Sequence, residues 1–186
     1  MSYFRRLLKG VMRKQVGILV FLSIVAVVLV QCDTREISKN EIEDLTGNSV
    51  TYALQPASSW NVSGTVVFSE KKDGSTLVNI QLSGLNSSSE HPVHLHMGNI
   101  ATDGAAVAAL LQPLNGKTGE SQTVLSHLAD ESSISFSDIK EWNACIKIHL
   151  SAFGEGQDVV LAAGNIGSAV SKDMGGRVAI GVCRSN

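Results

Sequence analysis

Histidine is the residue type through which this chain has most scope for chemistry. His94 and His96 lie two residues apart in the segment HPVHLHM. If this segment is a strand, both side chains leave the same face, because side chains alternate along a strand. His149 ends a second alternating segment, IKIH, and repeats the arrangement. Imidazoles placed in this way bind copper or zinc, so these three histidines form a predicted metal site.

A metal-free interpretation of the same pattern stays open. In it, His94 and His96 form hydrogen bonds that hold a surface loop. His91 extends the motif to H-x-x-H-x-H, which is more informative than a lone H-x-H pair. His127, in the segment LSHLAD, is expected at the surface or at a strand end and is a further candidate ligand.

Alternating apolar and polar residues predict that most of the chain forms short strands. Residues 76–83 read TLVNIQLS, with apolar and polar side chains on opposite faces. Seven or eight such strands, separated by Gly and Ser clusters, predict an all-β fold, an antiparallel Greek-key barrel or sandwich. Residues 134–141 fit either a strand or one helical turn. The other strand candidates are residues 49–55, 62–70, 91–97, 122–128, 145–150 and 177–183.

The apolar residues of the two histidine strands indicate which face the histidines occupy. Val93 and Leu95 alternate with the first two histidines, and Ile146 and Ile148 alternate with Lys147 and the third. The apolar sets must face the interior of the barrel. The histidines are therefore expected on the outer wall, where a loop can cover them.

The N-terminus is typical of an export signal. Residues 1–31 contain five basic residues and no acidic one, and residues 16–30 are an apolar run. A helix of this length rises about 22 Å, less than the roughly 30 Å hydrocarbon core of a bilayer. The run stops at LVQC, which resembles a bacterial lipoprotein signal in which Cys32 is lipidated. An uncleaved anchor and an ordinary cleavage nearby are the alternatives, and all three place the body outside the cytoplasm.

The predicted organisation is therefore a signal peptide (1–31), a lipidated Cys with a polar tether (32–47) and one β domain (48–186). Beyond residue 31 the chain has ten basic and 17 acidic residues, a net charge of −7. An acidic body argues against nucleic-acid binding, which needs a basic face. The expected partner is a membrane, reached through the lipid anchor from the periplasm or the cell surface. A protein or small-anion partner is left unidentified.

Several separated segments resemble the chordin-type (CHRD) domain of secreted bacterial proteins. The run HPVHLHMG followed by DGAAVAAL is similar to the family's H-I-H-x-G strand and its N/D-G-x-x-V segment. The later strand that ends in a histidine is matched by IKIH. The resemblance covers roughly residues 48–170. It implies an extracellular module without an established activity.

A more distant resemblance is to the copper/zinc superoxide dismutases, which are Greek-key β-barrels. The segment HPVHLH is similar to that family's H-G-F-H-V-H, so His94 and His96 match two copper ligands, and His149 matches a late third one. Arg177, in the segment GRVAIG, matches the arginine that guides the superoxide anion. The family's bridging histidine and two of its zinc ligands have no match. The resemblance therefore implies a three-histidine copper site, with zinc less favoured.

Cys145 and Cys183 are predicted to form a disulfide. Alternation in their two candidate strands places both cysteines on the outer face. If these strands are antiparallel neighbours with the cysteines opposite each other, His149 lies opposite Ala179 and Arg177 is a diagonal neighbour of His149 on the same face. An exported protein permits the bond, and two free thiols are the alternative.

Two functions from different classes follow from these observations. The favoured one is an exported, membrane-anchored CHRD-domain lipoprotein that acts as a non-catalytic binding module and has a histidine-rich metal site. The alternative is a copper-dependent superoxide dismutase with a reduced ligand set, which converts superoxide to oxygen and hydrogen peroxide. A purely structural surface lipoprotein is a third interpretation.

Overall fold

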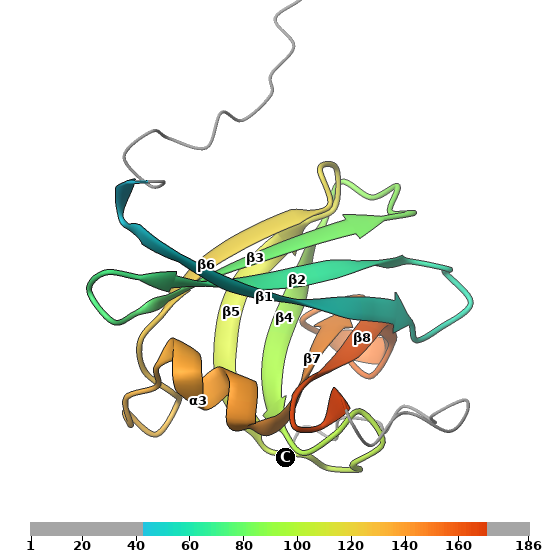
Figure 1. The fold of residues 1–186 in the computed structure, drawn as a ribbon. Helices are drawn as coiled ribbons and strands as arrows, with labels where there is room; N and C mark the ends of the chain where they lie inside the picture. Colours follow the sequence, from blue (N-terminus) through green and yellow to red (C-terminus); the bar gives the residue numbers. More distant parts are fainter. Residues whose placement is uncertain (1–42, 171–186) are drawn as a thin grey trace, which may run out of the picture. The chain divides into compact units, whose positions relative to one another are not determined.

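Eight antiparallel strands form a closed barrel in the computed structural model, which describes residues 43–170 (Figure 1). Around the barrel the strands follow the order β1-β2-β3-β6-β5-β4-β7-β8. The segment β3-β6-β5-β4 is a Greek key, so the predicted all-β antiparallel barrel is confirmed. The strands are β1 (Leu45–Pro56), β2 (Ser63–Lys71), β3 (Thr76–Ser83), β4 (Glu90–Met97), β5 (Val107–Asn115), β6 (Glu120–Leu125), β7 (Asn143–His149) and β8 (Val160–Gly167).

Period-two alternation builds the core that the barrel encloses. Along β3, Val78, Ile80 and Leu82 are buried, whereas Gln81 and Ser83 are exposed. The same alternation buries Val93 and Leu95 on β4. These strands are half-buried surfaces, and each contributes its apolar face to one common core.

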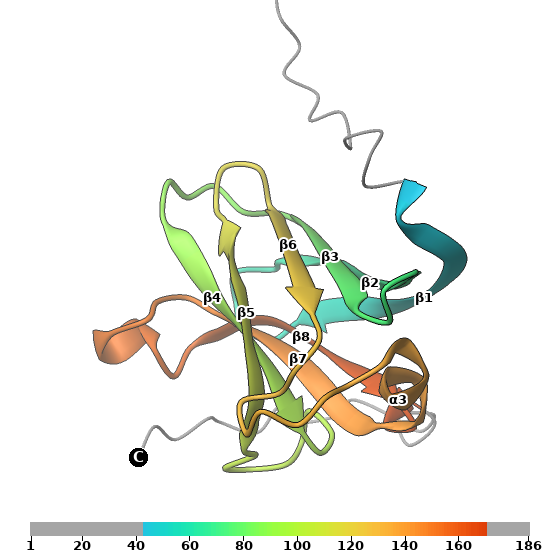
Figure 2. The ribbon, with the colours of Figure 1, turned by 90° about the vertical axis from the view of Figure 1, so that its left-hand side faces the viewer.

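The segment 134–141 forms a short helix, α3 (Phe136–Glu141), and not a strand. Ser135 caps it, because its side chain accepts from the backbone N–H of Asp138 while the Asp138 carboxylate accepts from the backbone N–H of Ser135. Phe136 and Ile139 are buried in the core. Helix α3 lies at the lower end of the barrel in both Figure 1 and Figure 2. Within residues 43–170, no helix has the length and apolar character needed to span a bilayer.

Two strands were not predicted, because neither shows a regular alternation. All residues of β8 except the last, Gly167, are buried, so this strand has no polar face to reveal its period. In β5 the pairing with β4 is irregular at two places, and the adjacent Ala108 and Ala109 are both buried. The predicted tether also ends earlier than expected, since β1 begins at Leu45.

The predicted pairing of β7 with residues 177–183 is wrong. Strand β7 is hydrogen-bonded to β4 on one side and to β8 on the other, so neither of its edges is free. His149 pairs with Val160 of β8. Arg177 and Cys183 lie outside the described residues, so the argument that placed Arg177 beside His149 no longer holds.

The barrel closes where β1 meets β8, through the register pairs Gln55–Ala163 and Pro56–Ala162. Next to these pairs is Gly164. A Cβ at this position would lie 2.2 Å from the backbone oxygen of Ala53. The absence of a side chain at Gly164 therefore lets the two strands approach closely enough to complete the barrel.

We expect Gly164→Ala to lower the free energy of unfolding by about 1–3 kcal/mol, because the added methyl group forces β1 away from β8. Chemical denaturation measures this difference. The matched control is Ala53→Ser, on the opposing strand, because the Ala53 side chain is exposed; its effect is expected within about 0.5 kcal/mol. Equal stability of the wild type and the Gly164 variant would contradict the closure argument.

Candidate metal site

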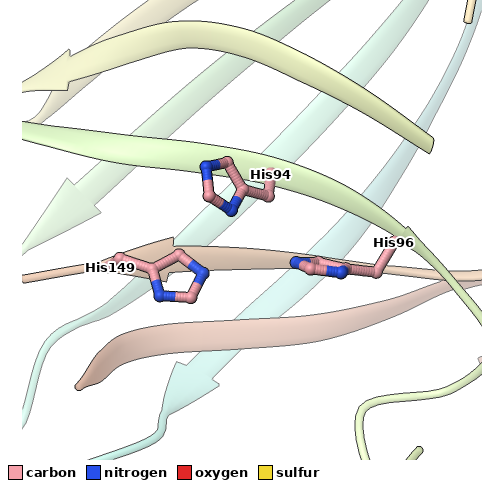
Figure 3. Close-up of side chains that lie close together, drawn as sticks. All are labelled: His94, His96 and His149. Carbon is pink, nitrogen blue, oxygen red and sulfur yellow. The ribbon is translucent and has the colours of Figure 1, made fainter. Parts of the chain in front are cut away.

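Three histidines from two neighbouring strands converge on the outer wall of the barrel (Figure 3). His94 and His96 lie on β4, and His149 is the last residue of β7. One ring nitrogen from each lies within 4.8 Å of the other two. The ring centroids of His94 and His149 are 4.7 Å apart, and those of His94 and His96 are 5.7 Å apart. The structure thus brings together the three residues that the sequence predicts as metal ligands.

The strand register explains why these side chains meet. His94 is opposite Lys147 and His96 is opposite Cys145, so all four side chains are on the face that points away from the core. His149 lies two residues beyond Lys147 on the same face. A bulge in the β7–β8 pairing lies just before His149, at the end of the strand.

Two loops cover most of this outward-facing site. His96 and His149 are 0 % and 2 % exposed, whereas His94 is half-buried. The loop between β4 and β5 is fixed to the barrel by Asn165 of β8, whose Oδ1 accepts a 2.7 Å hydrogen bond from the backbone N–H of Ile100. The loop between β7 and β8 begins with a backbone hydrogen bond from Leu150 to Val159. The expectation of a loop-covered outer face is confirmed.

Each covering loop also provides a backbone carbonyl that orients one imidazole. His96 Nδ1 lies 3.0 Å from the oxygen of Ala105, and His149 Nδ1 lies 2.8 Å from the oxygen of Gln157. A carbonyl only accepts, so in both rings Nδ1 carries the proton and donates it. Nε2 then has the lone pair that a metal requires. Metal-ligating histidines typically donate their other ring N–H to a carbonyl or carboxylate in this way.

The Nε2 atom of His149 is buried and has no hydrogen-bond partner among the described residues. Leaving a buried polar atom unpaired costs about 1–3 kcal/mol. A metal ion bound at this nitrogen would remove that cost. The donor set fits copper or zinc, because imidazole suits both ions.

Burial keeps the three imidazoles neutral. The pKa of His94 is lowered to about 4, mainly by burial and to a smaller extent by the neighbouring His149 and His96. Burial is also the largest cause of the lowered pKa of His96 and His149, although their hydrogen bonds to carbonyls oppose the shift. Neutral imidazoles have free lone pairs, so protons do not compete with a metal for these nitrogens near neutral pH.

Lys147 adds a positive charge to the same face. Its side chain is fully buried, and it lowers the pKa of both His96 and His149. Within the described part of the chain, no carboxylate joins the histidine cluster. The exposed Asp158 acts only as a minor influence that raises the pKa of His149. The candidate ligand set is therefore neutral.

The remaining histidines do not belong to the cluster. His91 is buried with the core-facing residues of β4, and its Nδ1 lies 3.0 Å from the oxygen of Leu150. His127 is exposed, and its Nδ1 lies 3.0 Å from Ser126 Oγ. The H-x-x-H-x-H motif therefore splits into one core histidine and two that line the site.

The other residues singled out from the sequence are only partly described. Cys145 is buried on the outer face, in register with His96 and Asn165. Cys32, Arg177 and Cys183 lie outside the described residues. Lipidation, anion guidance and the disulfide therefore stay predictions.

Some contributions to the site were missed from the sequence. The carbonyls of Ala105 and Gln157 have no signature, because any residue type supplies a carbonyl. The alternation in IKIH placed Lys147 on the histidine face, but gave no sign that it is fully buried. Asn165 is a polar residue in an otherwise apolar segment of β8. A buried amide needs a hydrogen-bond partner, so its position in the sequence could have indicated a structural role.

No protein-family model matches this chain, and no curated protein matches it at a significant level. The resemblances to the CHRD domain and to the copper/zinc superoxide dismutases therefore stay predictions. What the structure itself shows is an all-β barrel with three histidines gathered in a geometry that could hold a metal ion.

The lowered pKa values predict how the stability of the metal-free protein depends on pH. An unfolded histidine has a pKa near 6.5, whereas that of folded His94 is about 4. Between these values the unfolded state binds more protons, so the free energy of unfolding falls as pH falls from about 6.5 to about 4. The lowered pKa values of His96 and His149 act in the same direction.

Denaturation at a series of pH values checks this expectation. The variant His94→Gln is expected to lose stability less steeply in this window, because one of the groups that titrate there is gone. The control His127→Gln keeps the wild-type slope, since that ring is exposed and outside the cluster. Identical slopes for wild type and His94→Gln would show that the pKa of His94 is not lowered by folding.

Proposed function

We propose that this chain is an exported, membrane-anchored lipoprotein with a CHRD-type barrel, and that it acts as a binding module holding one copper ion. His94, His96 and His149 are the ligands in this proposal. Cys32 carries the lipid, and the site lies outside the cytoplasm. The export signal and the segments resembling CHRD domains support this placement, and the histidine cluster supports the metal.

The observation that carries the proposal is the position of the His149 ring beside two other imidazoles. Its Nδ1 is bound to the oxygen of Gln157, and its Nε2 is buried without a partner, facing the other two histidines. His91, in the core, also has a bonded Nδ1 and a buried Nε2 without a partner, so this state alone does not mark a ligand. What distinguishes His149 is that one of its ring nitrogens lies within 4.8 Å of ring nitrogens of two other imidazoles. The unpartnered lone pair is accounted for when Nε2 is a metal ligand.

The choice of copper follows from the ligand chemistry. Three neutral imidazoles bind Cu²⁺ more tightly than Zn²⁺ in the general order of divalent affinities. The positive charge of Lys147 lies on the same face, and among the described residues no carboxylate belongs to the cluster that would hold a divalent ion. Copper also has a monovalent state, which this neutral ligand set accommodates with less charge repulsion.

A copper-dependent superoxide dismutase is the second candidate function. One observation favours it: His94 is only half-buried, so a small anion can approach the cluster from that side. Bound copper would supply one-electron chemistry, and Lys147 would add positive potential that raises the encounter rate with an anion. Arg177 would contribute to the same potential if it lies near the site. The absence of the dismutase family's metal loop from the sequence favours the binding module.

Metal analysis after reconstitution tests the proposal. Wild-type protein incubated with copper and desalted is expected to retain about one copper per chain, in preference to zinc offered at the same concentration. His96→Ala removes a buried ligand and is expected to lose the copper. The control His127→Ala removes a histidine outside the cluster and is expected to retain it. Copper at the same level in wild type and His96→Ala would contradict the site.

The same samples separate the two candidate functions. A binding module retains copper and does not accelerate superoxide decay beyond what the His96→Ala protein shows. A dismutase accelerates that decay in proportion to its copper content, and the acceleration weakens as salt screens the positive potential. Acceleration of superoxide decay that depends on copper would show that the chain is a dismutase and not a non-catalytic binding module.

A further inference from the structure

The three histidines are held unequally. His96 and His149 are buried and donate hydrogen bonds to backbone carbonyls of two different loops. His94 is half-buried and makes no hydrogen bond with any residue of the described chain, and its ring lies next to the rings of His96 and His149. Two ligands are therefore fixed in orientation, and the third can turn about its side-chain bonds.

The surroundings of His94 are open to solvent on the β5 side. Its register partner on β5 is Leu110, which is 71 % exposed. Val107, the register partner of His96, is also exposed. On the β7 side, His94 borders the buried Lys147. Solvent-exposed side chains thus border His94 on the β5 side, which is the side from which a molecule in solvent would approach the cluster.

Release of either buried ligand would require more of the fold to move. To turn away from a metal, His96 must give up its bond to Ala105, and His149 its bond to Gln157. The loop that carries Ala105 is itself bound to Asn165 through Ile100. Displacing His94 breaks no hydrogen bond to a described residue.

We propose that His94 is the exchange ligand of the metal site, displaced by an incoming imidazole-class nitrogen ligand of a metal donor or acceptor while His96 and His149 keep the ion. This rests on the proposed metal-binding function. In the step, one metal–nitrogen bond to His94 breaks and one metal–nitrogen bond to the incoming ligand forms. No electron is transferred, and the His94 ring leaves as a neutral imidazole.

The partner in this proposal is defined by its chemistry. It presents a neutral imidazole, small enough to pass Leu110 and to occupy the volume that the His94 ring leaves. Imidazole nitrogen suits copper, so replacing one such ligand by another changes the binding energy little. The free-energy change of the exchange is therefore small in either direction. Delivery of a metal and its removal both require this.

Rescue by free imidazole tests the assignment. His94→Gly is expected to weaken Cu²⁺ binding, and imidazole in solution is expected to restore it to within about tenfold of wild type by occupying the vacated space. His149→Gly is expected to weaken binding more, and imidazole is expected not to restore it, because that position is buried beneath a loop. Equal losses, or rescue of His149→Gly as complete as that of His94→Gly, would overturn the assignment.

Exchange kinetics in the unaltered protein provide a test that does not depend on the folding of a variant. The rate of Cu²⁺ transfer from wild-type protein to an excess chelator is expected to rise in proportion to added imidazole. A rate that is independent of imidazole would mean that loop opening limits release, and would overturn the role of His94. Failure of wild type to bind copper at all would overturn both the metal site and the exchange ligand, so the two failures are distinguishable.

Discussion

Two hydrogen bonds from imidazole rings to backbone carbonyls determine what the outer wall of this barrel can do. They join His96 to Ala105 and His149 to Gln157, and they fix which nitrogen of each ring carries the proton. The strands bring the rings to one face, but strand geometry alone leaves each ring free to rotate and to change tautomer. The loops are therefore part of the site, and the bond from Ile100 to Asn165 links one of them to the barrel.

The site combines features that weaken the metal-free fold. Burial disfavours the protonated form of its imidazoles, and Nε2 of His149 has no partner in the described chain. Polar groups in this state cost stability unless they are paired. The closed barrel supplies the stability that offsets these costs, since its core is continuous and every strand is hydrogen-bonded on both edges.

The sequence predicted the fold class and the three candidate ligands because both depend on alternation. Val93, Leu95, Ile146 and Ile148 indicated the inner face, and the histidines between them had to lie outside. Alternation did not predict β8, because both faces of this strand are covered, or β5, because its pairing with β4 is irregular. It also failed for the neighbours of β7, because strand order depends on long-range contacts that no local pattern records. The carbonyls of Ala105 and Gln157 were unpredictable for the same reason.

The central claim is that one copper ion is bound by the imidazoles of His94, His96 and His149. X-ray absorption spectroscopy of the copper-loaded protein tests it most directly, because imidazole rings produce a characteristic outer-shell scattering that can be counted. The account predicts three imidazole ligands in wild type and one fewer in His94→Gly without added imidazole. A copper environment of oxygen or sulfur ligands, or one unchanged in that variant, would contradict it.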